Sequence, residues 1–177
     1  MKHLAFLPLF LAAPLSAQGV SAFATGPVFA DFGPHAPVEG IEQVPADTEF
    51  AVAFDVAEAA EDGRRNRGFE SAARFVNMHA AHGVPEENMR IAVVVHGRAV
   101  LDLLSPEGRA AHDLADNGSA AMVRQMLDHG VRFIVCGQSA TGQGVTQAEL
   151  IPGVETALSA MTAHALLQQR GYTVNPF

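Results

Sequence analysis

Short apolar runs alternate with longer amphipathic segments from residue 49 to the end of the chain. The clearest run, at residues 91–95, is consecutively apolar and mostly β-branched, as in a parallel strand that is buried on both faces. Runs at 50–56 and 131–137 and an alternating tail from residue 172 predict further strands. Because strands that alternate with helices build βαβ units, the pattern predicts an α/β fold with a mainly parallel sheet and helices on both faces.

The segments between these runs have helical spacing. Apolar residues recur at steps of three and four over residues 69–82, and Gly83 supplies a left-handed stop. A short helix is expected at 99–104, closed by Ser105 and Pro106, and another at 120–129. The glycine-rich segment 138–144 is expected to be a turn, and a long helix is expected over 154–170.

The N-terminus has the three parts of a secretory signal peptide: a short polar start at Lys2, an apolar run at residues 4–15, and small residues after it. A membrane span needs about 20 apolar residues, so this run is too short for an anchor, and no later run approaches that length. Cleavage after Ala17 is favoured because Pro14 ends the apolar helix; cleavage after Ala24 is the alternative. We therefore expect residues 1–17 to be removed and the protein to be periplasmic.

Residues 18–48 are rich in proline and glycine and are expected to form an N-terminal arm. The arm carries Val28, Phe29, Phe32 and Val38, which predict that it lies along the domain or along a neighbouring subunit. Residues 49–177 then form one domain, in keeping with a total length of 177 residues.

Composition narrows the function classes. Acidic residues outnumber basic ones 19 to 11, which argues against a nucleic-acid binder, because such a protein needs clustered Lys and Arg to neutralise phosphates. Apolar residues make up 49% and charged residues 17%, which predicts a homo-oligomer. The single cysteine, Cys136, excludes an intramolecular disulfide.

Candidate chemistry lies at two predicted strand ends, where ligands gather in open parallel sheets. His96 and Gly97 end one strand, and Cys136 and Gly137 end the next. Backbone N–H groups after Cys136 would stabilise a thiolate, so Cys136 is the candidate catalytic nucleophile and His96 its proton donor or acceptor. The candidate ligand-binding residues are Gly97, Gly137, Gln138 and Ser139.

Each of these residues also has a structural interpretation. Cys136 would be an inert core residue, and His96 would hydrogen-bond a loop carbonyl.

Other motifs are weaker indications of a functional site. The arginines at 64, 65 and 67 fit a solvated loop better than an anion site. His79 and His82 lie one helical turn apart, but without paired cysteines or an H-E-x-x-H motif the sequence predicts neither a metal site nor a cofactor.

Three segments carry a family resemblance: "NMHAAHGVPEENMRIAVVVHGRAVLDLL", "LDHGVRFIVCGQS" and "LIPGVETALSAMTAHALLQQRGYTVNPF". Together they resemble the DsrE/DsrF-like family of small α/β proteins associated with sulfur relay and sulfur oxidation. The resemblance implies a three-layer α/β/α sandwich with a mainly parallel five-stranded sheet, and homo-oligomers that are commonly trimers or hexamers. It also implies that Cys136 matches the position at which sulfur-transferring members carry persulfide sulfur.

Two functional hypotheses follow. In the first, the protein is an exported sulfur-handling protein in which the Cys136 thiolate accepts sulfane sulfur and His96 or nearby backbone donors stabilise the charge, with a sulfur donor or acceptor protein as a partner. In the second, it is a non-catalytic module that binds a small ligand or acts as an oligomeric accessory protein, with Cys136 as a wall residue. A reactive Cys136 with a low pKa separates the first hypothesis from the second.

Overall fold

The computed structural model describes residues 23–176, so the predicted signal peptide, residues 1–17, lies outside the described residues. Five parallel strands form one sheet in the order β4-β3-β2-β1-β5. The strands are β1 (Phe50–Val56), β2 (Met89–Val95), β3 (Arg132–Cys136), β4 (Glu155–Ala157) and β5 (Thr173–Asn175). The predicted α/β fold with a mainly parallel sheet is confirmed.

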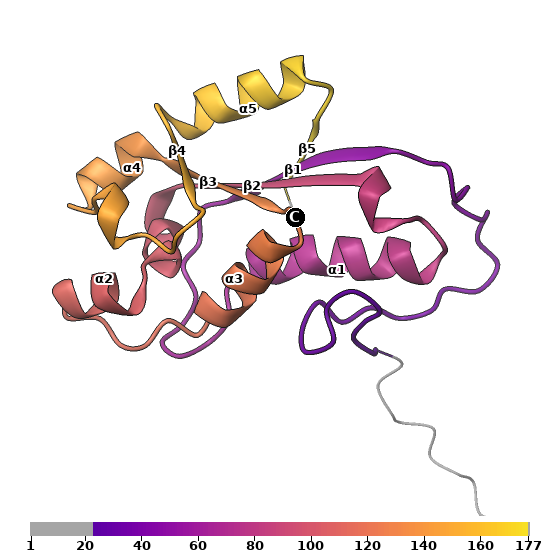
Figure 1. Ribbon diagram of the computed structural model, residues 1–177, viewed down its shortest axis with the longest axis horizontal. Coiled ribbons are helices and arrows are strands. Elements are labelled where there is room, and N and C mark those ends of the chain that lie inside the picture. The colour runs from indigo at the N-terminus through magenta and orange to yellow at the C-terminus, as the bar shows by residue number, and fades with distance from the viewer. Residues whose placement is uncertain (1–22, 177) are drawn as a thin grey trace, which may run out of the picture.

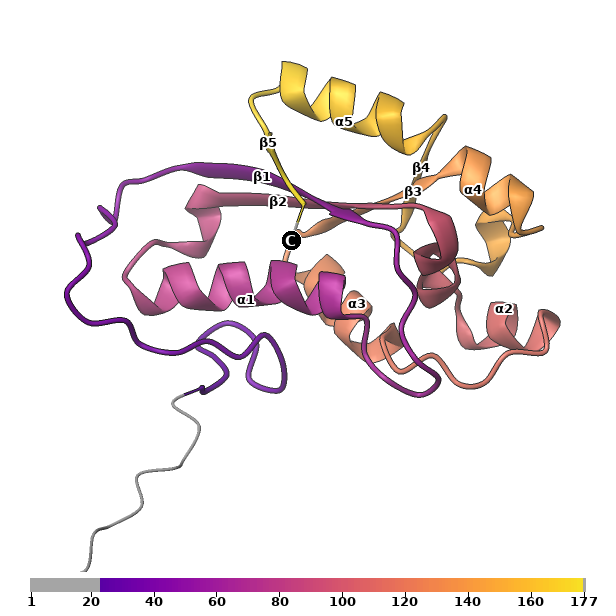
Figure 2. The same ribbon diagram turned by 180° about the vertical axis from the view of Figure 1, so that it is seen from behind.

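Helices cover both faces of the sheet (Figures 1 and 2). α1 (Arg67–Ala81) and α3 (Ala120–Asp128) lie on one face, and α5 (Ala160–Gln169) lies on the other. Shorter helices occupy the loops: α2 (Pro106–Ala111), α4 (Gly137–Gly142), and the 3-10 turns η1 (Glu86–Asn88), η2 (Gly97–Leu103) and η3 (Gln147–Glu149). In the described part of the chain, no helix has the length and apolar character that a membrane crossing requires.

The local chemistry of α1 agrees with its sequence pattern. The Asn66 side chain accepts hydrogen bonds from the N–H groups of Gly68 and Phe69, which satisfies two of the donors that a helix start leaves free. At the other end Gly83 has φ +92°, the left-handed conformation that terminates a helix. The helix runs within two residues of the predicted 69–82.

Three local predictions are wrong. Residues 137–142 form helix α4 instead of a turn, because Cys136 caps the helix start. The predicted short helix does end before Ser105, but the polar stretch expected after it begins with helix α2, where the Ser105 hydroxyl accepts from the N–H of Gly108. The expected long helix from residue 154 is divided into the short strand β4 and helix α5, since three residues are too few to show the alternation of a strand.

Side chains of the central strands alternate between the two faces of the sheet. Phe54, Val95 and Phe133 belong to the cluster that packs on α1 and α3. The neighbouring positions, Ala53, Val94 and Ile134, belong to a smaller cluster beneath α5. The same alternation places Asp55, His96 and Cys136 on the α5 face, at the carboxyl ends of three adjacent strands.

The N-terminal arm packs on its own domain. Phe29 and Phe32 are buried in the larger core cluster, whereas Val38 is exposed. The buried Asn77 of α1 holds the arm. Its Oδ1 accepts from the N–H groups of Val28 (3.1 Å) and Phe29 (2.8 Å), and its Nδ2 donates to backbone carbonyls at residues 29, 32 and 33. The arm is therefore built into the fold and does not hang freely from it.

Candidate functional site

Cys136 ends β3 and is the residue that begins α4. Its Sγ accepts a hydrogen bond from the backbone N–H of Ser139 at 3.5 Å, so the thiol occupies the place that Ser or Asp takes at most helix starts. The residue is 5% exposed. The sulfur thus lies just beneath the surface at the carboxyl end of the sheet, where parallel sheets bind ligands.

Two opposing effects act on the pKa of the Cys136 thiol. Burial raises the pKa, but hydrogen bonds from the Ser139 hydroxyl and from the backbone N–H groups of Ser139, Ala160 and Gln138 outweigh burial and hold it below its ordinary value. Ala160 is the first residue of α5, so the sulfur lies between the N-terminal ends of two helices. This environment favours the thiolate, which is the nucleophilic form of cysteine.

Ser139 connects Cys136 to the end of β2. The Ser139 Oγ accepts from the N–H of Gly97 at 3.1 Å, while its hydroxyl proton is directed to the Cys136 sulfur. Gln143 adds a second link, because its Nε2 donates to the carbonyl of Gly97 at 2.6 Å. Helix α4 is therefore fixed to the loop that carries His96 and Gly97.

Close packing requires glycine at two of the sequence-predicted site positions. A Cβ on Gly137 would lie 2.8 Å from the carbonyl oxygen of Ala157, and a Cβ on Gly97, which has φ +54°, would lie 2.9 Å from that of Ala57. The remaining predicted ligand-binding residue, Gln138, donates from its side chain to the carbonyl of Leu158 at 3.3 Å. These contacts bring Gly97, Gly137, Gln138 and Ser139 into one neighbourhood around Cys136.

His96 lies on the same face and at the same end of the sheet as Cys136, one position beyond the pair formed by Val95 and Val135. Neighbouring strands lie about 4.8 Å apart, so the two residues are adjacent. The imidazole hydrogen-bonds Asp55, with 3.2 Å between Nε2 and Oδ2, and makes no hydrogen bond to Cys136 within the described structure. The groups that lower the pKa of the thiol are thus N–H and O–H donors.

Sequence reasoning missed Asp55 and His164. His164 of α5 places its Nε2 at 2.7 Å from Oδ1 of Asp55, so the carboxylate bridges two imidazoles. Burial raises the pKa of Asp55, but hydrogen bonds and attraction from His164 and His96 outweigh it and hold the pKa below its usual range. Asp55 was visible as the one polar side chain of an apolar strand, whereas His164 lies 109 residues away and gave no comparable signal.

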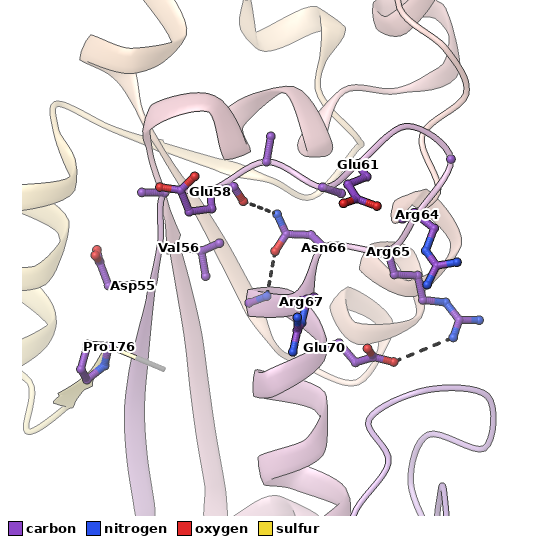
Figure 3. A pocket seen from close by; sticks show the side chains of 15 residues that line it. Asp55, Val56, Glu58, Glu61, Arg64, Arg65, Asn66, Arg67, Glu70 and Pro176 are labelled. Atoms are coloured by element: carbon purple, nitrogen blue, oxygen red, sulfur yellow. Dashed lines mark hydrogen bonds and ion pairs between the residues drawn. The ribbon is translucent and has the colours of Figure 1, made fainter.

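A cavity of about 880 Å³ opens beside Asp55, at the carboxyl end of β1 (Figure 3). Its walls come from residues 55–61 and 63–68, together with Glu70 and Pro176. Arg64, Arg65 and Arg67 line it, and Arg65 donates to the carbonyl of Asp31 at 2.9 Å. Cys136 and His96 do not line this cavity. Asp55 is therefore the residue that the cavity and the histidine cluster share.

The described residues contain no group of His, Cys, Asp and Glu side chains arranged to hold a metal ion. His79 and His82 instead direct Nδ1 toward carbonyl oxygens of their own helix, those of Phe75 and Met78, both at 2.7 Å. Their helical spacing thus serves local hydrogen bonding in this structure.

Comparisons with known proteins agree with this architecture. A search of curated proteins gives no significant match. Among solved structures, the protein of unknown function MTH1491 from Methanobacterium thermoautotrophicum is similar, with a TM-score of 0.52 and 19% identity over 73% of this chain and 100% of that one. At this identity the likeness shows the fold alone. The profile of the DsrE/DsrF-like family matches residues 50–176, which is most of the chain and contains both Cys136 and the cluster at Asp55. The chain belongs to the DsrE/DsrF-like family.

Proposed function

We propose that this protein handles sulfane sulfur and that Cys136 is the residue that accepts it. The observation that carries the proposal is the position of the Cys136 sulfur, which N–H groups from the starts of α4 and α5 and the Ser139 hydroxyl surround. Membership of the DsrE/DsrF-like family supports the same assignment. The donors that stabilise a thiolate would also stabilise the anionic outer sulfur of a persulfide or the charge that develops during transfer.

The transfer needs no oxidant. The Cys136 thiolate attacks the outer sulfur of a donor persulfide, the S–S bond of the donor breaks, and its electron pair leaves with the donor thiolate. A new S–S bond then joins Sγ to the transferred sulfur. Because the chain holds one cysteine, an external thiol must take this sulfur by the same exchange in reverse. With polysulfide as donor, the leaving group is a polysulfide one sulfur shorter.

Burial limits which donors react directly. Cys136 is 5% exposed, so a small inorganic polysulfide reaches the sulfur more easily than a large thiol reagent does. We expect a protein donor to react only after a local movement exposes Cys136, whose sulfur is held by the N–H of Ala160 at the start of α5.

Intact-mass analysis of the protein after exposure to polysulfide tests the proposal. The native protein should gain the mass of one or more sulfur atoms, and a thiol reductant should remove it. The Cys136→Ser variant should gain none, because serine cannot form the S–S bond. Absence of an adduct on the native protein, with an adduct on the unfolded protein, would contradict the proposal.

We further propose that the protein is exported to the periplasm and works as a homo-oligomer, with a trimer as the expected state from the family resemblance. Cleavage after Ala17 would retain Ala24, whose N–H and C=O both pair with His35. N-terminal sequencing of exported material should begin at Gln18.

The oligomer proposal has support at the start of α5. Leu158 and Met161 are 71% and 80% exposed there, and subunit contact would cover them. Light scattering should give a mass well above that of one chain, which is 18.6 kDa before cleavage.

The cavity beside Asp55 supports a second candidate function, the binding of a small ligand without catalysis. Its volume of about 880 Å³ lies in the range of ligand sites, which is about 300–1,000 Å³. NMR titration of the protein with a library of small organic acids and amines tests this function. Chemical-shift changes confined to residues 55–70 and retained in Cys136→Ser would support it, and no saturable change would contradict it.

A further inference from the structure

The carboxyl end of the α5 face holds a cluster of titratable groups that ordinary packing does not explain. Asp55 comes from β1, His96 follows β2, His164 comes from α5, and Cys136 ends β3. Beneath α5 the sheet otherwise presents small and apolar side chains such as Ala53, Ala92 and Val94. The other charged side chains associated with this face, Arg90, Arg132, Glu155 and Arg170, belong to its opposite end.

The hydrogen bonds determine where each imidazole carries its proton. Asp55 offers one oxygen to each histidine: Oδ1 to His164 at 2.7 Å and Oδ2 to His96 at 3.2 Å. A carboxylate only accepts hydrogen bonds, so the facing atom of each ring, Nε2, must carry the N–H. In a neutral imidazole the other nitrogen, Nδ1, is then free of a proton.

The two histidines differ in what surrounds Nδ1. The Nδ1 atom of His164 is buried and has no hydrogen-bond partner, and the side chain is 16% exposed. A proton there would add a buried N–H without an acceptor, which is costly. The His96 side chain is 32% exposed, and residue 96 directly follows β2, the strand next to the one that ends at Cys136, so solvent and small molecules can reach its ring. His164 is therefore a fixed hydrogen-bond donor to Asp55, whereas the ring of His96 stays within reach of other groups.

We propose that Asp55 and His164 are positioning residues that hold His96 with its proton on Nε2, so that Nδ1 of His96 carries the proton exchanged during sulfur transfer at Cys136. Nδ1 takes the proton of the Cys136 thiol as the thiolate forms, and it returns that proton to the donor thiolate that leaves. Asp55 balances the positive charge that His96 holds between these two steps. This inference rests on the proposed sulfur transfer.

The first test does not depend on sulfur transfer. Nitrogen-15 NMR of the histidine rings in the full protein distinguishes a proton on Nε2 from a proton on Nδ1. We expect His96 to carry it on Nε2 in the wild type, and Asp55→Asn to lose this preference. A proton on Nδ1 in the wild type, or an unchanged tautomer in Asp55→Asn, would overturn the proposal even if Cys136 accepts sulfur.

The second test measures the rate at which polysulfide modifies Cys136 as a function of pH. His96→Gln, Asp55→Asn and His164→Gln should each slow the reaction, by at least about tenfold for His96→Gln, and should change the shape of the pH profile of the rate. The double variant with both His96 and Asp55 replaced should be no slower than His96→Gln alone, because both changes remove one function.

His112→Gln is the matched control. His112 also places Nε2 at 3.2 Å from a carboxylate, that of Glu149, but does so in another part of the molecule. In His112→Gln, the rate at which polysulfide modifies Cys136 and the pH profile of that rate should equal those of the wild type. Equal rates and profiles in Asp55→Asn and the wild type would overturn the proposal, and if Asp55→Asn does not fold, the wild-type tautomer and His164→Gln decide. A Cys136 that accepts no sulfur from polysulfide at any pH would instead contradict the proposed function, and the NMR test would still decide the positioning of His96.

Discussion

The two faces of the sheet differ in what they bury. On the α1 and α3 face, aromatic rings pack against one another: Phe69 and Phe133 meet edge to face at 5.2 Å, and Phe29 stacks on Phe32 of the arm at 4.9 Å. On the α5 face the strands present mainly small side chains, and the carboxyl ends carry Asp55 and the groups around it. The comparison indicates that the α1 and α3 face, here called the aromatic face, supplies most of the stability. The α5 face holds the polar side chains of the candidate site.

Small side chains on the α5 face have a geometric consequence. Ala53 and Ala92 of the strands and Ala163 of the helix are all buried there, which brings α5 close to the sheet. That approach places His164 within hydrogen-bonding distance of Asp55 and the N–H of Ala160 near the Cys136 sulfur. The thinner core on this side therefore assembles the site.

Truncating a ring on the aromatic face should have the largest effect on the free energy of unfolding. We expect Phe133→Ala to lower the free energy of unfolding by about 3–5 kcal/mol, because Phe133 is fully buried against Phe69. Cys136→Ser on the other face should cost less than about 1 kcal/mol, since a hydroxyl can accept the same N–H bonds. Urea denaturation measures both variants. A Cys136→Ser cost equal to that of Phe133→Ala would contradict the assignment of stability to the aromatic face.

Removing the side-chain amide of Asn77, which holds the arm, should have the second-largest effect on the free energy of unfolding. Asn77→Ala leaves buried backbone groups of Phe29, Phe32 and Gly33 without partners, and we expect a loss of about 3 kcal/mol. Asn88→Ala is the control, because the Asn88 amide donates to a carbonyl at an exposed site. Its effect should stay within about 0.5 kcal/mol in the same denaturation experiment. Equal effects of the two variants would show that the arm adds little to the aromatic face.

Adding a methyl group at Gly137 should lower stability by less and should change the reactivity of Cys136. Gly137→Ala places Cβ against the carbonyl of Ala157, so we expect a loss of about 1–3 kcal/mol and a changed alkylation rate. Gly142→Ala, in the same helix with open space around it, should leave the rate unchanged and stabilise by up to about 1 kcal/mol. If both variants behaved alike, the close packing of Gly137 in α4 against Ala157 of β4 would have no role at Cys136.

The smallest expected effect concerns acid stability. The pKa of Asp55 is lower in the folded protein than in the unfolded chain, so the folded state binds fewer protons and gains stability as pH rises. This contribution is complete above the unfolded pKa of about 4 and is lost as pH falls through the folded pKa. Between neutral pH and pH 3, Asp55→Asn should therefore lose less stability than the wild type. Parallel stability curves for the two proteins would contradict this expectation.

The sequence predicted the fold better than it predicted the site. Long apolar runs such as residues 91–95 identify buried strands, because burial on both faces leaves a continuous pattern. Strand β4 escaped detection because its three residues are stabilised by pairing with β3, which is a tertiary contact. Cys136 and His96 could be selected because each precedes a glycine at a strand end. The bridge from Asp55 to His164 could not, since it depends on how α5 packs.

The central claim is that hydrogen bonds at two helix starts hold the Cys136 thiol in a reactive state, and the pH dependence of its alkylation in the native protein tests this most directly. With a small iodoacetamide reagent, the rate should rise with a midpoint below the ordinary cysteine pKa of about 8.5. Ser139→Ala should move the midpoint upward, because it removes the hydroxyl that hydrogen-bonds the sulfur. A midpoint at or above the ordinary value, or alkylation only after unfolding, would contradict the claim.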